Sequence, residues 1–475
     1  MATNDLVVAI ELGSSKIAGA VGRKCADGSL QVLAYADEPV SGSVRRGVVY
    51  NIDQTAQGLS NLINRLEPEL GNYTIEQVYV GVGGYTLHSE HNTVARTFEE
   101  EVRVSETTVD EMEEENANKQ YPGYGMLMMV SQEYKIGNNL LNDPVGVNCV
   151  QVEGNYLNIL TRTSVIHNTA KSFEIAKVNI ADTAISPLVA ANVLLTDSER
   201  RQGCVLLDFG ADTTTVSVYK GGNLRFLTVI PMGGQSITRD LSTLNLVDDE
   251  AERLKCEYGL LPPASSDDTI TLEEGRSVEL RKVYEVIDAR FEEIILNACH
   301  QIEAAGYTDK QLLAGIVCCG GGIHLKGFQS AVEKKSPFSK VRLAYNTVTN
   351  VEWNAMERPA NGTQGVLVGL LMDGTDNCCQ CGLQMEIPAE DEGRAVTGNL
   401  FTDDGESAQA QRDEALRQQR QQKIREAEER KAAIQTEKLK GVANGFFTGL
   451  VKRMRSMGDN IDKLATDFLK DEDKE

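Results

Sequence analysis

The stretches VAIELGSSKIAGAVG, Val8 to Gly22, and VLLDFGADTTTVSVYKGG, Val205 to Gly222, share one pattern. Each begins with a short apolar run typical of a buried strand and places an acid two residues before a glycine. Each then continues through small hydroxyl residues into a second apolar alternation that ends in glycine, which predicts two β-hairpins. Their turns fit phosphate, because glycine permits close approach and because backbone N–H groups and hydroxyls donate to phosphate oxygens. Two such turns facing across a cleft would hold a nucleoside triphosphate.

A third glycine-rich turn follows in GIVCCGGGIHLKGF, Gly315 to Phe328. An apolar strand runs into the glycines 320–322, and we expect a helix to begin near Leu325, an arrangement suited to adenosine and phosphate. Each element by itself also fits an ordinary turn. Together they favour a nucleotide cleft that differs from the two common phosphate loops, because no GxxxxGK(S/T) occurs and no GxGxxG follows an amino-terminal strand.

The order of these elements resembles that of the actin-like ATPase superfamily, and more closely the bacterial cell-division actin homologues of the FtsA family. The resemblance implies an α/β fold, namely an actin-like two-domain fold with two ribonuclease-H-like halves around a nucleotide cleft, an inserted α/β subdomain 1C, a flexible tail and an amphipathic helix. It covers most of residues 5 to 375, and further segments that carry it are SQEYKIGNNLLNDPVGV (131–147), SPLVAANVLLTDSERRQGCVLLDFG (186–210), AERLKCEYG (251–259) and YEVIDARFEEI (284–294).

The resemblance also divides the chain into domains. Within them we expect a helix near Asp53 to Leu66, and we expect the strand after Lys340 and a helix at Gly362 to Leu371 to close back on the first half. The expected ranges are 1–84, 166–202 and 341–375 for subdomain 1A, 85–165 for subdomain 1C, 203–236 and 311–340 for subdomain 2A, 237–310 for subdomain 2B, 376–440 for a polar linker and 441–470 for the amphipathic helix.

The family's nucleotide site maps onto the three turns and the AERLKCEYG segment, and its cofactors are ATP and Mg²⁺. Asp208 and Glu11 are expected to hold Mg²⁺ through water, since hydrated divalent cations favour carboxylate partners. The residues implied for ATP are Gly13, Ser14, Ser15, Lys16, Gly210, Thr213, Thr214, Gly233, Gly234, Glu252, Lys255, Gly320, Gly321 and Gly322.

The second loop departs from the family pattern acid-x-Gly-Gly-Gly-Thr. Ala211 and Asp212 stand where two further glycines are usual. A carboxylate near a triphosphate is repulsive unless a metal or a lysine offsets it. We therefore expect an ATP-binding protein with at most slow ATPase activity, and the sequence assigns no catalytic residue.

Composition limits the partners and the compartment. A net charge of −23 argues against nucleic acid as a partner. The ten cysteines show no disulfide framework and no signal-peptide pattern opens the chain, so we expect a reducing cytosol. Cys378, Cys379 and Cys381 are interpreted as thiols of a loose connector, with metal ligation as the alternative that lacks a second ligand pair.

The segment GVANGFFTGLVKRMRSMGDNIDKLATDFLK, Gly441 to Lys470, repeats apolar residues at spacings of three and four. As a helix it would carry an apolar stripe with basic residues beside it, which fits a helix lying on an anionic membrane surface. The alternative is a helix docked on the protein's own core, and the long polar stretch before the segment favours the membrane. The residues expected to contact the membrane are Phe446, Phe447, Leu450, Val451, Lys452, Arg453, Met454, Ile461, Leu464 and Phe468.

The resemblance also implies a function. The chain would bind ATP, assemble with itself into filaments and tether the tubulin homologue FtsZ to the inner face of the cytoplasmic membrane at the division site, as a peripheral protein that recruits later division proteins through subdomain 1C. Arg290 matches the family's basic contact for the FtsZ carboxy-terminal peptide, and a surface arginine paired with a neighbouring glutamate is the alternative interpretation. A small-molecule kinase and a pilus-assembly ATPase of the same superfamily are the alternative functions, and the amphipathic tail argues against both.

Overall fold

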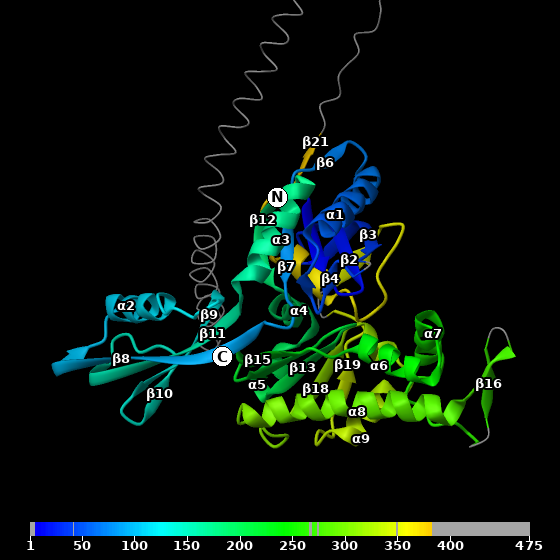
Figure 1. Cartoon of the computed structure of the whole chain (residues 1–475). Coiled ribbons are helices and arrows are strands. Elements are labelled where there is room, and N and C mark those ends of the chain that lie inside the picture. The colour runs from blue at the N-terminus through cyan, green and yellow to red at the C-terminus, as the bar shows by residue number, and fades with distance from the viewer. Residues whose placement is uncertain (1–4, 41, 266–267, 273–274, 348–349, 382–475) are drawn as a thin grey trace, which may run out of the picture. The chain divides into compact units, whose positions relative to one another are not determined.

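The computed structural model describes residues 5–40, 42–265, 268–272, 275–347 and 350–381. The chain divides into two units, Met1–Gly382 and Leu383–Glu475, and all described residues belong to the first. This unit contains two large sheets and a smaller third sheet built by an inserted segment (Figure 1). The predicted membrane residues and the predicted linker beyond Cys381 lie outside the described residues.

The first half of the unit carries the first phosphate turn and is interrupted by the inserted segment. Its elements up to the insertion are β1 (Val7–Leu12), β2 (Lys16–Lys24), β3 (Leu30–Pro39), β4 (Val44–Arg45), β5 (Val48–Val49), α1 (Ile52–Leu66), η1 (Glu67–Leu70), β6 (Tyr73–Ile75) and β7 (Gln77–Val82). The insertion is β8 (His88–Arg103), α2 (Glu106–Ala117), β9 (Tyr124–Ile136), β10 (Asn139–Leu141) and β11 (Asn148–Arg162). The first half then resumes with α3 (Thr163–Ala176), β12 (Asn179–Ile185), α4 (Ser186–Leu194) and α5 (Asp197–Gln202).

The second half follows, and the chain finally returns to the first. The second half consists of β13 (Cys204–Phe209), β14 (Thr214–Lys220), β15 (Asn223–Ile230), α6 (Gly234–Leu241), η2 (Ser242–Leu244), α7 (Asp248–Tyr258), β16 (Thr269–Thr271), β17 (Ser277–Glu279), α8 (Leu280–Ala304), β18 (Gly315–Cys319), η4 (Gly321–His324), α9 (Phe328–Lys335) and β19 (Val341–Leu343). The returning segment is β20 (Val351–Trp353), α10 (Gly365–Asp373) and β21 (Cys379–Cys381).

The two large sheets repeat one topology. In each, an antiparallel meander of three strands is extended beside its first strand by two parallel strands. The strand orders are β3-β2-β1-β7-β12 and β15-β14-β13-β18-β19, and the first sheet adds β20 next to β3. Both predicted hairpins are confirmed, with Leu12 paired to Ile17 and Phe209 paired to Thr214 across their turns. The repeat gives the two related halves expected of the fold.

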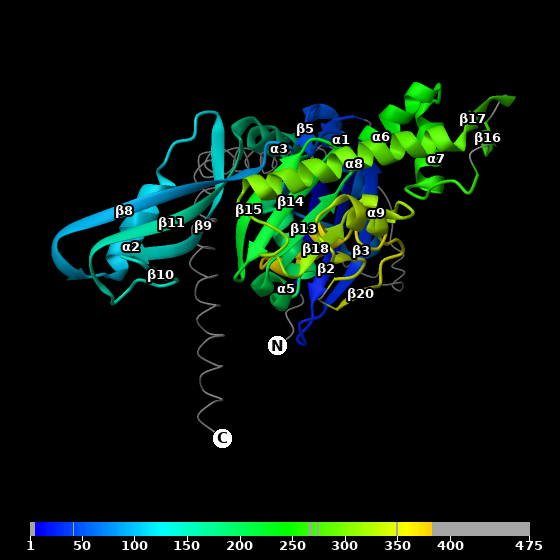
Figure 2. The same ribbon diagram turned by 90° about the horizontal axis from the view of Figure 1, so that it is seen from below.

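Helix α1 shows how the sequence covers these sheets. The Asn51 side chain accepts a hydrogen bond from the Gln54 N–H at 3.1 Å, which caps the helix at its first turn. The buried side chains recur at spacings of three and four, so one face of α1 packs on β2 and β3. This confirms the helix predicted near Asp53 to Leu66. On the second sheet, the 25-residue helix α8 crosses β14 and β15 (Figure 2).

The inserted segment forms its own four-stranded sheet, in the order β10-β9-β11-β8, with α2 against β8. Although it interrupts the first half, it contacts the second, where the Leu227 N–H donates to Ser89 Oγ at 2.8 Å. The guanidinium of Arg225 donates to both carboxylate oxygens of Glu133, at 2.7 Å for the Nη1 to Oε2 bond. The insertion is therefore anchored to β15.

Two local predictions need correction. The strand after Lys340, β19, pairs parallel with β18 in the second sheet, so the chain rejoins the first sheet only at β20. The helix expected near Leu325 is instead the short η4 from Gly321 followed by α9 from Phe328, because the chain must turn at Gly327, whose φ is +80°.

The cysteine cluster is part of the body rather than a loose connector, and the expected linker therefore starts later than residue 376. Cys378 donates its N–H to Leu6 O at 2.7 Å and accepts from the Glu76 N–H at 3.0 Å. Strand β21 pairs with β6, and Cys378 and Cys379 are buried in the first core. Burial of the thiols and pairing of the backbone hold this segment against the first half.

Candidate functional site

A cavity of about 450 Å³ lies between the two halves, within the range of roughly 300–1,000 Å³ that small-molecule sites occupy. The residues that line it come from strands and helices of both halves and from the turns and loops between them. Nearly all predicted site residues converge there. Those that line the cavity are Glu11, Gly13, Ser14, Ser15, Lys16, Asp208, Gly210, Thr213, Gly234, Glu252, Lys255, Gly320, Gly321 and Gly322.

The two phosphate turns have the same backbone geometry. The Gly13 N–H donates to Lys16 O at 3.0 Å, and the Gly210 N–H donates to Thr213 O at 2.9 Å. A Cβ on Gly13 would meet Lys16 O at 2.7 Å, and one on Gly210 would meet Thr213 O at 2.9 Å. Both turns are therefore tight enough to exclude larger residues, as the prediction of close approach to phosphate requires.

Two residues predicted for the ATP site, Thr214 and Gly233, do not line the cavity. Thr214 is fully buried and donates its hydroxyl to Met232 O at 2.9 Å, whereas Thr215 lines the cavity. Alternate residues of a strand face opposite sides, so Thr213 and Thr215 share a side that Thr214 cannot share. Gly233 packs behind the second turn, since a Cβ there would meet Gly210 O at 2.5 Å.

The carboxylates of Glu11 and Asp208 face the same cavity from the two halves. Burial, with the negative charge of Asp208 as the second cause, raises the pKa of Glu11 to about 8, while Lys16 acts in the opposite direction. Burial raises the pKa of Asp208 to about 6, although a hydrogen bond from Cys319 lowers it. Two desolvated carboxylates, one of which raises the pKa of the other, fit a divalent cation, which would offset the cost of burying their charges.

The part of the chain that the structure describes contains no larger cluster of side chains that could ligate a metal ion directly. No group of three or more His, Cys, Asp or Glu side chains is placed there to hold a metal ion. A pair of carboxylates matches a Mg²⁺ ion that keeps most of its water shell. The residues present therefore fit the water-mediated role predicted for Glu11 and Asp208.

The third turn requires glycine where it meets the second. Gly320 has a φ of +88°, and a Cβ on it would meet Asp208 Oδ1 at 2.3 Å and Phe209 O at 2.7 Å. A Cβ on Gly322 would meet the Phe209 ring at 2.1 Å. By contrast, nothing lies within 4 Å of a Cβ on Gly321. These two glycines therefore allow the turn after β18 to pack against Asp208 and Phe209, the last two residues of β13.

Lys255 and Glu252 line one part of the cavity, and hydrogen bonds hold both side chains in place. The Lys255 ammonium donates to Glu252 Oε2 at 2.6 Å, to Thr238 Oγ1 at 2.9 Å and to Gly234 O at 3.2 Å. Its side chain is only 8% exposed. These contacts fix α7 to α6, so Lys255 positions this part of the cavity in addition to lining it.

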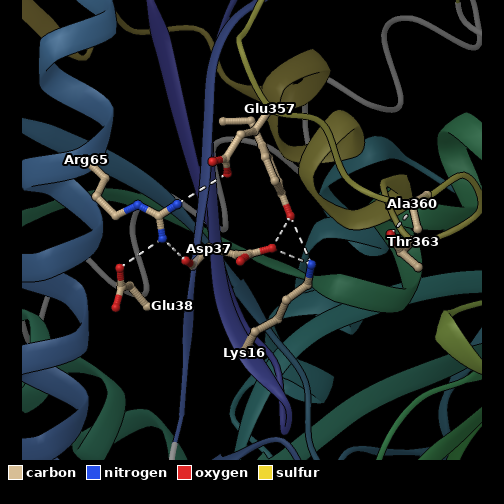
Figure 3. Close-up of polar contacts among 8 residues, drawn as sticks. Lys16, Asp37, Glu38, Arg65, Glu357, Ala360 and Thr363 are labelled. Atoms are coloured by element: carbon tan, nitrogen blue, oxygen red, sulfur yellow. Dashed lines mark hydrogen bonds and ion pairs between the residues drawn. The ribbon is translucent and has the colours of Figure 1, made fainter. Parts of the chain in front are cut away.

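Lys16 is held by the first half's own sheet. Its ammonium donates to Asp37 Oδ2 at 2.6 Å and to the Tyr35 hydroxyl at 3.0 Å. Burial disfavours the charged form, but these hydrogen bonds outweigh it and raise the pKa of Lys16. Figure 3 shows Lys16 facing Asp37, and nearby Arg65 pairs with Glu38 and Glu357. Lys16 therefore stays a cation at the rim of the first turn.

Sequence reasoning missed several residues that line the cavity. Except for His324, they come from segments outside the three motifs. The glycines among them were the available signal, and Gly47 and Gly84 do approach so closely that a Cβ on Gly47 would meet Gly84 Cα at 2.7 Å. The missed lining residues include Tyr35, Gly47, Gly83, Gly84, Ser186, Gln235, Cys256, His324, Pro359, Gly362 and Thr363.

Arg290 lies on α8, away from the residues that line the cavity. Its Nε donates to Asp240 Oδ2 at 2.5 Å and its Nη1 donates to Glu293 Oε2 at 2.5 Å. The side chain is 26% exposed. Arg290 is thus paired within the body, and its binding of a partner peptide stays a prediction.

The repeated sheets and the cleft between them define the class of protein as actin-like. In line with this, the chain is similar in structure to the PilM–PilN type IV pilus biogenesis complex, with a TM-score of 0.55 and 15% sequence identity, over 77% of this chain and 98% of that chain. At such identity the likeness shows the fold alone.

The sequence comparisons specify the family. The chain is 30% identical over 343 residues to the cell division protein FtsA of Porphyromonas gingivalis, which covers 70% of this chain and 71% of that protein. It is 27% identical to the FtsA of Bacillus subtilis over 70% of this chain and 77% of the relative, and 24% identical to that of Escherichia coli over 69% and 81%. The family model for cell division protein FtsA matches residues 205–361. The chain belongs to the FtsA family of cell division proteins.

Proposed function

We propose that this protein binds ATP with Mg²⁺ in the cleft between its halves and uses an ATP-dependent body to hold FtsZ polymers at the membrane. The observation that carries the nucleotide assignment is the meeting of three glycine turns from distant parts of the sequence around one cavity. Binding of one ATP per chain, measured by calorimetry with and without Mg²⁺, tests this assignment.

Different residues of the cleft would bind the phosphates and the cation. The backbone of the two phosphate turns and the hydroxyls of Ser14, Ser15 and Thr213 would donate to phosphate oxygens, and Thr215 takes the place first given to Thr214. Lys16 would offset phosphate charge. Glu11 and Asp208 would hold the hydrated Mg²⁺, which when bound neutralises triphosphate charge.

The assembly and membrane parts of the proposal rest on the family and on the tail. Self-assembly of the body would strengthen membrane binding even if each tail binds weakly, because linked copies raise the effective concentration of each tail at the bilayer. Among the described residues, no helix has the length and apolar character needed to cross a bilayer. The proposed attachment is assigned, from its sequence pattern, to the apolar stripe in Gly441 to Lys470.

Deleting Gly441 to Glu475 is expected to abolish sedimentation with anionic vesicles while leaving a folded body. The described cores contain no residue beyond Cys379, so the deletion removes nothing from them. Phe447→Glu with Leu450→Glu should also abolish binding. Lys452→Glu with Arg453→Glu should weaken it on anionic lipid by about 1 kcal/mol for each basic side chain removed from the membrane surface. Unfolding of the truncated chain would place the stripe in the core, and continued sedimentation would place the membrane-binding segment elsewhere.

The partner site on α8 is tested by freeing or removing the Arg290 guanidinium. Arg290→Gln is expected to weaken binding of the FtsZ carboxy-terminal peptide by about tenfold at low salt, because the positive charge that would face the peptide is removed. Asp240→Asn is the matched control, since it removes one of the two carboxylates that pair with the guanidinium but keeps the guanidinium itself, and it should preserve or strengthen binding. Fluorescence anisotropy measures both. If the two variants weaken binding alike, Arg290 only braces α8 on α6 and the peptide binds elsewhere.

A further inference from the structure

The carboxylate that sets the second phosphate turn apart from the family pattern, Asp212, does not line the cavity, although its neighbours Ala211 and Thr213 do. Its side chain is 18% exposed, and its Oδ1 lies 3.6 Å from Arg239 Nη2 on α6. The turn itself is fixed to α6, because the Gly234 N–H donates to Gly210 O at 3.0 Å and the Gln235 N–H donates to Ala211 O at 2.7 Å. Asp212 is thus held rigidly by the second half.

The other carboxylate oxygen of Asp212 reaches the first half. Asp212 Oδ2 accepts a hydrogen bond from the Arg46 N–H at 3.2 Å. Arg46 and Gly47 are the two turn residues of the β4–β5 hairpin, in which Arg45 pairs with Val48. Both have positive φ, 51° and 70°, as a two-residue hairpin turn requires.

The next amide of the same turn serves the other phosphate loop. The Gly47 N–H donates to Ser14 Oγ at 2.8 Å. Two successive N–H groups at one hairpin tip therefore hold the two loops, one through Ser14 of the first half and one through Asp212 of the second. Gly47 itself lines the cavity, which places this tip at the phosphate end of the cleft.

The hairpin tip is in turn fixed from behind. The Tyr85 N–H donates to Arg46 O at 3.0 Å, and Gly47 packs on Gly84 with no space for a side chain. A glycine in place of Asp212 would offer no side-chain acceptor, so the second loop would have no such bond to the hairpin. The chain therefore has a hydrogen bond across the cleft that a glycine at position 212 could not form.

We propose that Asp212 is a positioning residue that closes the phosphate end of the cleft through the Arg46 amide, so that nucleotide can enter or leave only when this bond opens. The inference rests on the proposed nucleotide site. On this inference, the aspartate at position 212 limits the rate of nucleotide exchange. Simple repulsion between Asp212 and a triphosphate is the competing explanation, and it predicts a different set of rate constants.

The hydrogen bond is tested first without nucleotide, on the full chain. Asp212→Gly removes the acceptor and should speed hydrogen exchange of the Arg46 amide by about tenfold or more, the expected effect of removing a charged acceptor. Asp212→Asn keeps an acceptor oxygen of the same shape and should stay within about threefold of the parent protein. Equal exchange in the parent and the glycine variant would overturn the inference, whatever the cleft binds.

Stopped-flow kinetics with a fluorescent ATP analogue and Mg²⁺ then separate closure from repulsion. Closure predicts that Asp212→Gly raises the association and dissociation rate constants together, by about five- to tenfold, with Asp212→Asn close to the parent. Repulsion predicts that both variants associate faster and that dissociation slows or stays the same, and this result would overturn the inference. Arg46→Gly, which keeps the amide and removes the guanidinium, should match the parent. If no variant binds the analogue but the hydrogen-exchange pattern holds, the nucleotide assignment fails while the hydrogen bond between the halves stands.

Discussion

Gly320→Ala is expected to abolish ATP binding, whereas Gly321→Ala should change the affinity by less than about threefold. The two positions are adjacent and both line the cavity, but their surroundings differ. At Gly320 the φ of +88° disfavours any side chain, and the new Cβ would sit 2.3 Å from Asp208 Oδ1. Either the carboxylate or the third turn must move, and both are parts of the proposed site. At Gly321 a Cβ meets nothing within 4 Å.

Calorimetric titration with Mg²⁺ and ATP measures this difference, with thermal melts of the free proteins as the control for folding. A decrease of about 100-fold or more in the affinity of Gly320→Ala, in a protein that still melts cooperatively, supports the placement of the third turn against the carboxylate. Normal affinity in a folded Gly320→Ala protein would show that ATP does not depend on this turn. Equal decreases in both variants would indicate that the whole turn, rather than its packing on Asp208, is disturbed.

Asp208→Asn is expected to act in opposite directions on the free and the nucleotide-bound protein. Free of cation, Glu11 and Asp208 are buried carboxyls whose pKa values are raised to about 8 and about 6 from ordinary values of 4.5 and 3.8. Removing one carboxylate relieves the electrostatic cost of the other. The free variant should therefore be more stable at alkaline pH by at least about 1 kcal/mol, yet it should bind Mg²⁺ with ATP about 100-fold more weakly.

The pH dependence follows from the same pair. A carboxyl whose pKa is raised by folding contributes its full stability below the pKa of the unfolded chain and loses it as pH rises through the folded value. The free protein should thus lose stability between about pH 4.5 and pH 8, the window set by Glu11. Asp208→Asn should flatten this decline, because the charge of Asp208 is the second cause of the Glu11 shift.

Thermal melts across this pH range, with and without Mg²⁺ and ATP, test both signs. Asp212→Asn is the matched control, since it is the same chemical change in the same hairpin but outside the cavity, and it should leave the decline unchanged. If Asp208→Asn destabilises the free protein at alkaline pH, the carboxylates are stabilised by partners other than a cation. If it leaves binding of Mg²⁺ with ATP intact, Asp208 has no role in holding the ion.

Much of the fold could be predicted from local pattern. An acid, a glycine and small hydroxyl residues between two apolar runs define a hairpin by themselves, because the turn needs glycine and the strands need apolar residues on both buried faces. The turns at Gly13 and Gly210 therefore appear where the sequence placed them. Helix α1 likewise follows from its cap at Asn51 and its apolar spacing.

The positions of the side chains around the cavity were harder to predict from the sequence. Because residues 213–215 are all threonine, the sequence does not show which of them face the cavity and which face the core. Only the packing of β14 decides that Thr214 is buried. Strand β19 is similar, because a three-residue strand has too little pattern to identify its sheet, and pairing with β18 assigns it. For Arg290 the sequence offered a neighbouring glutamate as a partner, and Glu293 on the same helix takes that role, but the pairing with Asp240 comes from the packing of α8 on α6.

The sequence by itself determined the two hairpins, the glycine turns and the family, since these depend on local backbone freedom and on the order of motifs. The tertiary structure alone decided where Asp212 acts. The sequence predicted that the Asp212 carboxylate lies near a triphosphate. In the structure the loop is held on α6, so the carboxylate instead contacts Arg239 and accepts a hydrogen bond from the Arg46 amide. That outcome depends on the β4–β5 hairpin reaching both loops, a long-range arrangement of the two halves that no local pattern specifies.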